Sequence, residues 1–382
     1  MSLRVVSGRL PLALLLVAGW ATAQEPAVPG NGAQRATVSD ASPAAEFRAA
    51  YARWTELDKQ LNGIGQRYSS AADQAQRDQL KAEYSELVKH SETLLPELQK
   101  AAWAAFQAAP NADASATKVL IGLVAYEYRR DDYDAAISLA KQLFDAGCQE
   151  PVLYGIAGTA AYASDNYDLA EDYLTKASKA GKLSEEGQQF LADLPERKQL
   201  WQTEQAIRAK EAEADDLPRI KLQTSKGAVV IELFENEAPN AVANFVSLVE
   251  KKFYDGVPFH RVLPGFMAQG GDPTGRGTGG PGYKIACECY RDDYRHHFRG
   301  SLSMAHSGKD TGGSQFFLTF RPTAHLDGRH TCFGRVVEGL DVLPKLQRRD
   351  PNAPEAPAPD TIVKAEVLRK RDHAYQPKKV GQ

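Results

Sequence analysis

The stretch FHRVLPGFMAQGGD, residues 259–272, places one permanent cation among apolar side chains. Arg261 precedes the pair Phe266 and Met267 by five residues, and Gln269 and two glycines follow them. The stretch holds no obvious nucleophile, no cluster of metal ligands and no phosphate-binding loop. Whatever chemistry it supports must therefore rely on an arginine beside an apolar pocket.

The sequence around this stretch has the pattern of a β-rich domain. GAVVIELF at 227–234 and DTIVKAEVLRK at 360–370 alternate with a period of two, and GSLSMA and SQFFLTF are typical of further strands. Pro239 is a helix-start residue, and Val242, Phe245, Val246 and Val249 share one face of the short helix that follows it. Strands, one packed helix and glycine-rich loops over roughly 150 residues predict a closed barrel whose ends are covered by helices.

Four longer segments occur in a familiar order with familiar spacing. They are GAVVIELFENEAPNAVANFVSLV, FHRVLPGFMAQGGD, GSLSMAHSGKDTGGSQFFLTF and HLDGRHTCFGRVVEGLDVL. Together they resemble the cyclophilin family of peptidyl-prolyl cis–trans isomerases, over residues 218–371. The resemblance implies an eight-stranded antiparallel barrel capped by two helices, with the active groove on the outside of the barrel.

The resemblance also implies a role for individual residues. Arg261 matches the catalytic hydrogen-bond donor, and Gln269 matches a polar residue that orients Arg261 and the substrate. The residues that match the proline pocket are Phe266, Met267, Phe317, Leu326 and His330. Those that match the backbone-binding side of the groove are Ala305, His306 and Gln315. Taken singly, Arg261 also fits a surface ion pair, and the apolar residues also fit a barrel core.

Isomerisation explains why the stretch needs no nucleophile. Rotation about an X-Pro bond crosses roughly 18–20 kcal/mol because amide resonance is lost, and no covalent bond breaks. A catalyst only has to bind the twisted form better than either planar isomer. In that form the proline nitrogen gains a lone pair, and arginine is a fixed, planar donor for it at any physiological pH. We therefore expect a cofactor-independent isomerase acting on proline-containing polypeptides; the alternative is a binding or chaperone module that grips such peptides with little turnover.

Two positions depart from the family pattern. His306 stands where many members have asparagine, and His325 in TAHLDG stands where the best-known eukaryotic members carry tryptophan. All four tryptophans lie outside the expected barrel, at positions 20, 54, 103 and 201. Because that tryptophan helps the family hold cyclosporin, we expect weakened affinity for the drug, with peptide turnover largely intact. His325 remains among the expected substrate-binding residues.

Residues 44–213 have the composition of a helical domain. AAEFRAAYARWTELDKQLNGIG at 44–65 predicts an amphipathic helix that stops at Gly63, and a second long helix is predicted over about 72–107, broken near Pro96. QLWQTEQAIRAKEAEADD at 199–216 predicts a terminal helix frayed by its charges. The domain should therefore be all-α.

A repeat runs through the middle of this helical domain. DDYDAAISLAKQLFDAG at 131–147 and DNYDLAEDYLTKASKAG at 165–181 match at a spacing of 34 residues. That period is the tetratricopeptide spacing, and the second unit resembles the consensus best. A generic array of helical hairpins is the alternative. By analogy the repeats would bind a protein partner or client; a helical spacer or dimerisation element is the other interpretation.

The N-terminus resembles a secretory signal peptide. Residues 1–23 carry Arg4 and Arg9, then an apolar stretch, then Ala21-Thr22-Ala23. The alternative, an uncleaved anchor, is disfavoured because about eleven apolar residues are short for a membrane span. Residues 24–43 are expected to be a flexible leader and 372–382 a flexible tail. The protein would be exported, either periplasmic or secreted, without a membrane span after cleavage, and its net charge of −3 gives no reason to expect nucleic acid.

The four cysteines, Cys148, Cys287, Cys289 and Cys332, allow three complete pairings, and their spacing does not choose among them. CECYRDDYRHH combines zinc-ligand types, but its spacing is unlike the common zinc frameworks, so no metal is expected. GDPTGRGTGGPG at 271–282 lacks the G-K-[ST] ending of a phosphate loop. It is interpreted as a flexible loop that flanks the groove.

Overall fold

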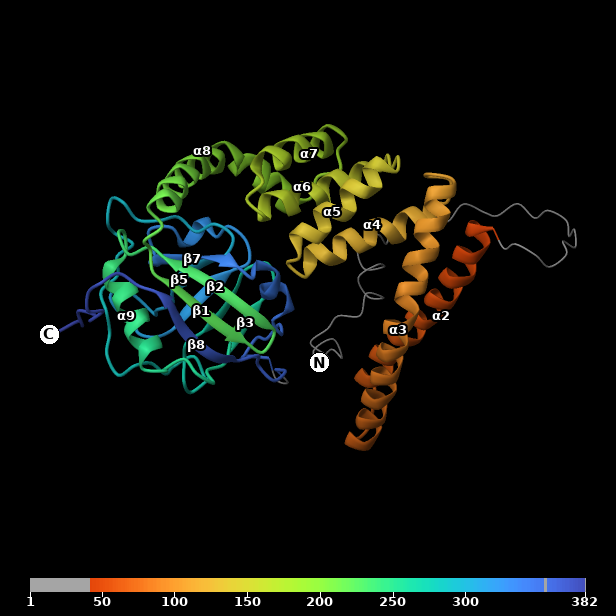
Figure 1. The fold of residues 1–382 in the computed structure, drawn as a ribbon. Helices are drawn as coiled ribbons and strands as arrows, with labels where there is room; N and C mark the ends of the chain where they lie inside the picture. Colours follow the sequence, from red (N-terminus) through yellow and green to blue (C-terminus); the bar gives the residue numbers. More distant parts are fainter. Residues whose placement is uncertain (1–41, 354–355, 382) are drawn as a thin grey trace, which may run out of the picture. The chain divides into compact units, whose positions relative to one another are not determined.

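The computed structural model describes residues 42–353 and 356–381 (Figure 1). The expected signal peptide lies outside the described residues, as does nearly all of the expected leader. The chain forms two compact units: the first comprises residues up to 126 together with 138–153, and the second comprises 127–137 together with 154 onward. Within the described residues, no helix combines the length and the apolar composition that a bilayer crossing requires.

The first unit contains a hairpin of two long helices, α2 (Pro43–Ser69) and α3 (Gln74–Ala108), which pack along each other (Figure 1). The prediction that the first helix stops at Gly63 is wrong, because α2 continues through it. A glycine inside a helix costs about 1 kcal/mol, and the neighbouring Ile64, which is fully buried, offsets that cost.

The second long helix has about the expected bounds but is more regular than expected. The prediction of a break near Pro96 is wrong, since α3 contains this residue in its interior. A proline lacks the N–H and crowds the preceding turn. The residues on either side of it, Leu94 and Leu98, are buried, so packing of the hairpin holds the helix together across the proline.

The following helices are α4 (Ala114–Arg129), α5 (Tyr133–Asp145), α6 (Pro151–Ala163), α7 (Tyr167–Lys179) and α8 (Glu185–Ala214). A Cβ added at Gly158 would lie 2.8 Å from Leu174, so the small residue allows α6 and α7 to approach closely. The α8 helix runs through Pro195 to Ala214, and Glu204 and Glu211 within it are buried. The expected fraying by charges is therefore wrong.

The 34-residue repeat reappears in the geometry of the turns before α5 and α7. Asp131 and Asp165 both have left-handed backbone conformations, with φ of 65° and 63°. Each carboxylate accepts a hydrogen bond from the tyrosine two residues later, at 2.8 Å from Tyr133 and 3.2 Å from Tyr167. Both aspartates are buried. The two turns are therefore built in the same way.

The C-terminal region is an antiparallel sheet of eight strands in the order β3-β4-β6-β5-β7-β2-β1-β8. The strands are β1 (Arg219–Thr224), β2 (Gly227–Leu233), β3 (Arg261–Leu263), β4 (Met267–Gly270), β5 (Ser301–Met304), β6 (Phe316–Thr319), β7 (Cys332–Glu338) and β8 (Ile362–Arg369). The four segments predicted as strands from the sequence correspond to β2, β5, β6 and β8, and the sheet has the eight antiparallel strands that the resemblance implied.

The sheet is a half-barrel, open between β3 and β8, rather than the closed barrel that the sequence predicted. β3 has only three residues, which pair with β4, and β3 and β8 lie at the two ends of the sheet order. The segment before it forms an isolated bridge between Pro258 and Thr361, with a hydrogen bond of 2.8 Å from the Phe259 N–H to the Asp360 carbonyl. A few backbone bonds thus replace the missing ladder.

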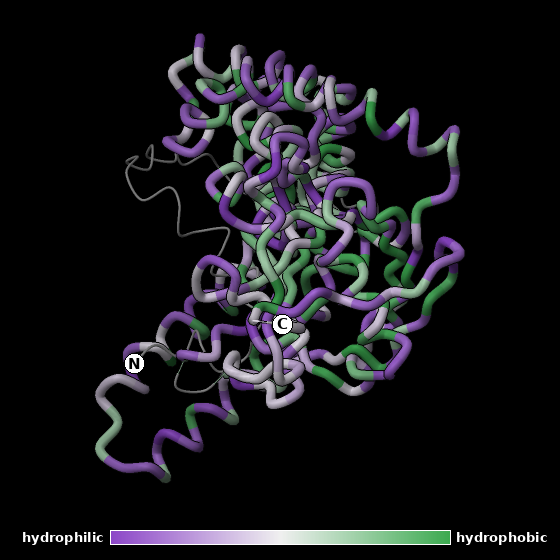
Figure 2. Tube along the Cα trace, turned by 90° about the vertical axis from the view of Figure 1, so that its left-hand side faces the viewer, coloured by the Kyte–Doolittle hydropathy of each residue, from purple (hydrophilic) through white to green (hydrophobic). Residues whose placement is uncertain are grey.

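The helix α9 (Pro239–Glu250) covers the core of this sheet. The predicted apolar face is confirmed, because Val242, Phe245, Val246 and Val249 are all at most 2% exposed. Two helices were expected as caps, but the next helical segments, η2 (Ala324–Leu326) and η3 (Leu340–Lys345), are short 3₁₀ turns. Figure 2 shows hydrophobic segments gathered in the interior of the trace, and buried residues of the strands and of α9 form the core of the sheet region.

Candidate functional site

The hairpin of β3 and β4 carries the first part of the site. Arg261 begins β3 and lies directly opposite Gln269 of β4. The turn between the strands contains Gly265, which has a φ of 67°, and then Phe266, whose N–H donates to the Leu263 carbonyl at 3.2 Å. The glycine permits this tight turn, which places Phe266 and Arg261 on the same short hairpin.

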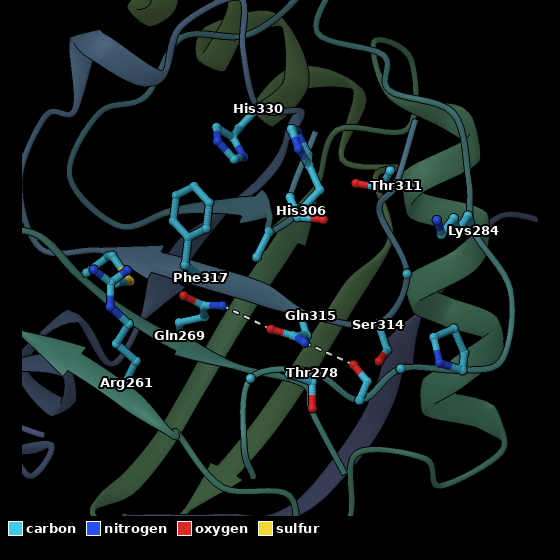
Figure 3. Close-up of a pocket in the computed structure, with 18 of the residues that line it drawn as sticks. Arg261, Gln269, Thr278, Lys284, His306, Thr311, Ser314, Gln315, Phe317 and His330 are labelled. Atoms are coloured by element: carbon cyan, nitrogen blue, oxygen red, sulfur yellow. Dashed lines mark hydrogen bonds between the residues drawn. The ribbon is translucent and has the colours of Figure 1, made fainter. Parts of the chain in front are cut away.

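The strand β6 extends the site across the sheet. Gln269 lies opposite Phe317 in the register of β4 and β6. The Gln269 side-chain N–H₂ donates to the Gln315 side-chain carbonyl at 3.0 Å, and the Gln315 N–H₂ donates to the Gly279 carbonyl at 2.9 Å (Figure 3). The Gln315 backbone carbonyl accepts from the Ala305 N–H at 3.0 Å. A short chain of amides therefore fixes the floor of the site.

These elements surround a groove of about 760 Å³. One part of it, called here the apolar pocket, is lined by Phe266, Met267, Phe317, Leu326 and His330. Figure 3 shows Arg261 near one end of the groove and Lys284 near the other, with Gln269 and Gln315 between them. The groove thus joins a cation, an apolar pocket and a row of amide groups.

The structure brings nearly all the expected site residues to this groove. Its lining includes Arg261, Phe266, Met267, Gln269, Ala305, His306, Gln315, Phe317, Leu326 and His330. The exception is His325, which lies on η2 outside the lining, with its ring 5.5 Å from that of Phe266. Its ring contact with Phe266 connects it to a lining residue of the groove.

Sequence reasoning missed the second wall of the groove. Residues 277–284 form this wall, together with Ser307, Thr311, Gly313 and Ser314. The glycine-rich segment gave the only signal, since it was expected to flank the groove. The Val380 N–H of the C-terminal segment donates to the Lys284 carbonyl at 2.8 Å, and the Lys379 ammonium lies 4.8 Å from the centre of the Tyr283 ring. The expected flexible tail thus contacts the groove wall in this structure.

One carboxylate organises the loop that leads into this wall. Asp272 is fully buried and accepts hydrogen bonds from the backbone N–H groups of Thr274, Gly277 and Thr278 at 2.7, 2.5 and 3.0 Å. Burial alone would raise the pKa of Asp272, but hydrogen bonds from Thr274 and the glycine N–H groups lower it to about 2. The loop is therefore held by an ionised carboxylate at neutral pH.

Arg261 is half-buried and is not neutralised by the protein. Within residues 42–353 and 356–381, its guanidinium has no ion-pair or side-chain hydrogen-bond partner. A guanidinium presents five donors and stays protonated. At the edge of the apolar pocket, its donors are available to a group that enters the groove.

Two histidine rings stack at the rim of the apolar pocket. The centroids of His306 and His330 are 4.1 Å apart with an interplanar angle of 18°, and His330 also meets Phe317 edge-on. Burial lowers the pKa of both imidazoles, since it disfavours the charged form, although hydrogen bonds to the Arg329 and Met304 carbonyls act in the opposite direction. Both rings are therefore neutral at pH 7.

The histidine pair makes a pH dependence predictable. The unperturbed pKa of histidine is about 6.5. An imidazole whose pKa is lowered stays neutral at any pH above that value and becomes protonated only at lower pH. We expect kcat/KM for an X-Pro peptide to be nearly constant from about pH 7 to 8.5 and to fall below about pH 6, when charge enters the stacked pair. His306→Asn should reduce the acid-side fall, and a bell centred near neutral pH in the wild type would contradict this account.

The cysteine-rich segment does not contribute to the groove chemistry. All four cysteines are free thiols, and Cys287 accepts a hydrogen bond from the Asp310 N–H at 3.2 Å. In the same segment, His297 uses one ring nitrogen on Asp327 and the other on Ser303, each at 2.8 Å. In the part of the chain that the structure describes, no group of metal-ligating side chains is arranged to hold an ion.

The sequence of the groove region matches a known family model and known enzymes. The model described as cyclophilin type peptidyl-prolyl cis-trans isomerase/CLD matches residues 219–367 and leaves residues 1–218 unmatched. A peptidyl-prolyl cis-trans isomerase of Helicobacter pylori is 52% identical over 143 residues, which make up 37% of this chain and 87% of that protein. One from Synechococcus elongatus is 55% identical over 131 residues, or 34% of this chain and 88% of that protein.

A comparison with solved structures gives the same family name. The crystal structure of a cyclophilin type peptidyl-prolyl cis-trans isomerase of Cryptosporidium parvum is similar to this chain with 31% sequence identity. The match covers 41% of this chain and 99% of that chain, with a TM-score of 0.38.

Proposed function

Because this chain belongs to the cyclophilin-type peptidyl-prolyl cis-trans isomerases, we propose that Arg261 is the group by which it lowers the barrier to X-Pro rotation. The proline ring enters the apolar pocket, and the chain on either side lies along the amide-lined floor of the groove. The observation that carries this proposal is the unpaired guanidinium of Arg261 at the edge of that pocket. The reaction needs no cofactor.

The reaction has two requirements that the groove meets. The proline ring must be held while the preceding carbonyl turns, and the buried side chains of Met267 and Phe317, 1% and 5% exposed, supply a firm apolar wall. As the imide twists, its nitrogen becomes pyramidal and gains a lone pair. A guanidinium donor then binds the twisted form more strongly than either planar isomer, which is the condition for catalysis.

Gln269 has a supporting role in this scheme. Its N–H₂ group is committed to Gln315, and its side-chain carbonyl accepts no hydrogen bond from the residues that the structure describes, so this oxygen can accept one. That oxygen lies on the strand directly opposite Arg261. In the proposal it accepts from the guanidinium and orients the remaining N–H groups toward the imide nitrogen. The amide chain from Gln269 to Gly279 keeps this acceptor in place.

The substrates in this proposal are exported polypeptides. Arg4, Arg9, the apolar residues after them and Ala21-Thr22-Ala23 support this interpretation. We expect the mature protein to be recovered outside the cytoplasm and to begin at Gln24. N-terminal sequencing of the protein from each cell fraction is the test. A cytoplasmic protein that retains residues 1–23 would refute the export.

The helical region would add a binding surface for a partner or client. Support comes from the repeated turns at Asp131 and Asp165 and from the close approach at Gly158, which fit a tetratricopeptide-like stack. Stacks of this kind present extended surfaces to other polypeptides. The isomerase would in this way meet its clients through two surfaces of one chain.

A further inference from the structure

Residues of the helical region in the second unit contact the loops that carry the apolar pocket. The second unit includes residues 127–137, 154–214 and the whole sheet. The Asp131 carboxylate accepts a hydrogen bond of 2.7 Å from the N–H of Gly265, the residue before Phe266. Two N–H groups of Arg197, on α8, donate to Asp327, the residue after Leu326, at 3.4 Å each.

Asp327 connects this ion pair to the pocket itself. Its second carboxylate oxygen accepts from the backbone N–H and the ring Nδ1 of His297, both at 2.8 Å. His297 is fully buried, and its ring lies nearly parallel to that of Phe317, with centroids 6.1 Å apart and an angle of 12°. One carboxylate therefore links α8 to two lining residues of the pocket, Leu326 through the chain and Phe317 through the His297 ring.

The pair of Arg197 and Asp327 is well placed to fix geometry. The side chains are 6% and 9% exposed, so water screens their attraction weakly. Asp327 also accepts from the His296 ring at 3.0 Å, so each of its oxygens is used. Without Arg197, the carboxylate would keep its histidine partners but lose the cation that holds it toward α8. The η2 turn would then be free to move with Leu326.

We propose that Arg197 is a positioning residue for the apolar pocket, acting through Asp327 on Leu326 and on the contact between His297 and Phe317. The inference rests on the proposed function in one respect, since it takes the apolar pocket as the place where proline binds. It assigns to the helical region a part in substrate binding by the isomerase. The region then supports the enzyme from behind the pocket, in addition to any partner that it binds.

The expected effect is on binding more than on rotation. A loosened pocket binds the planar and the twisted forms of the proline peptide more weakly by the same factor. Such a uniform loss of binding energy raises KM without lowering kcat. We expect Arg197→Ala in the full-length protein to raise KM for an X-Pro peptide about fivefold and to leave kcat within about twofold. Arg197→Lys should restore part of the difference, because it keeps the charge but not the planar pair of donors.

Lys198→Ala is the matched control, because Lys198 is the next residue on α8 and pairs with Asp168 and Glu171 of α7. Its KM should equal that of the wild type. If Arg197→Ala does not fold, Arg197→Lys and Arg197→Gln carry the same comparison. A folded variant of Arg197 with a wild-type KM and unchanged His297 ring resonances by NMR would overturn the inference.

The same experiment separates this inference from the assignment of Arg261. If the proposed mechanism is wrong, Arg261→Ala will have a normal kcat. That result would not change the KM expected for Arg197→Ala. The NMR resonances of His297 and Leu326 report the position of the pocket without any turnover. A shift of both in Arg197→Ala but not in Lys198→Ala supports the positioning role whichever residue accelerates the rotation.

Discussion

Replacement of Arg261 by alanine is expected to lower kcat/KM for an X-Pro peptide by about a hundredfold or more, with little loss of stability. Removing one preorganised hydrogen-bond donor that faces a charge developing in the transition state typically lowers kcat by a factor of about 10²–10³. The stability should hold because Arg261 is half-buried and has no ion-pair or hydrogen-bond partner among residues 42–353 and 356–381 that its removal would leave unpaired. A protease-coupled assay measures the rate, and thermal unfolding checks the fold.

Two further variants show which property of Arg261 matters. Arg261→Lys keeps the charge but loses the planar array of donors, so it should recover only a small part of the rate. Arg276→Ala removes the same charge from an exposed residue of the loop beside the groove, and its rate should stay within about twofold of the wild type. Equal losses of kcat/KM in Arg261→Ala and Arg276→Ala would mean that the positive electrostatic potential around the groove, and not a hydrogen-bond donor held at Arg261, accelerates the reaction.

Replacement of Arg295 by alanine is expected to destabilise the protein by about 3–5 kcal/mol, the largest effect on stability predicted here. The Arg295 guanidinium is 2% exposed and bonds Glu204 of α8 at 2.8 and 3.0 Å and Glu211 of α8 at 2.5 Å. It also lies 3.8 Å from the centre of the Phe234 ring. Removal of the guanidinium would leave the buried carboxylates of Glu204 and Glu211 with less positive charge beside them. It would also open a cavity over the Phe234 ring.

The direction of the pKa of Glu204 supports this expectation. Burial alone would raise the pKa of Glu204, but the charges and hydrogen bonds of Arg295 first, and of Arg208 after it, together lower the pKa. Arg291→Ala is the matched control, since Arg291 lies in the same loop and its pair with Asp293 is exposed; it should cost less than about 1 kcal/mol. Urea unfolding of both variants decides the matter, and equal stability of the two would show that the buried cluster contributes nothing.

The sequence predicted the sheet region well, and the reason is local. Strands such as 227–234 and the helix with Val242 and Phe245 on one face carry their own periodicity. Such patterns do not show whether the sheet closes into a barrel. Closure would require β3, which has three residues, to pair with β8 at the other end of the sheet order. The extension of α2 through Gly63 likewise depends on burial of Ile64, which the glycine itself does not signal.

The site was predictable where its residues lie close together in sequence. Arg261, Phe266, Met267 and Gln269 occupy one hairpin, and Gln315 directly precedes β6, the strand that contains Phe317. The contacts behind the pocket were not predictable in this way. Arg197 and Asp327 are 130 residues apart, and in a helix rich in charge nothing distinguishes a buried arginine from an exposed one.

The central claim is that Arg261 accelerates rotation of a proline bond that is already bound. NMR exchange measurements on an X-Pro peptide, with wild-type protein and with Arg261→Ala at equal fractions of bound peptide, test it most directly. The account predicts that both proteins bind the peptide with Kd values within a few-fold of each other, whereas the rate of cis–trans exchange on the bound peptide falls about a hundredfold in the variant. An undiminished exchange rate on peptide bound to Arg261→Ala would contradict it.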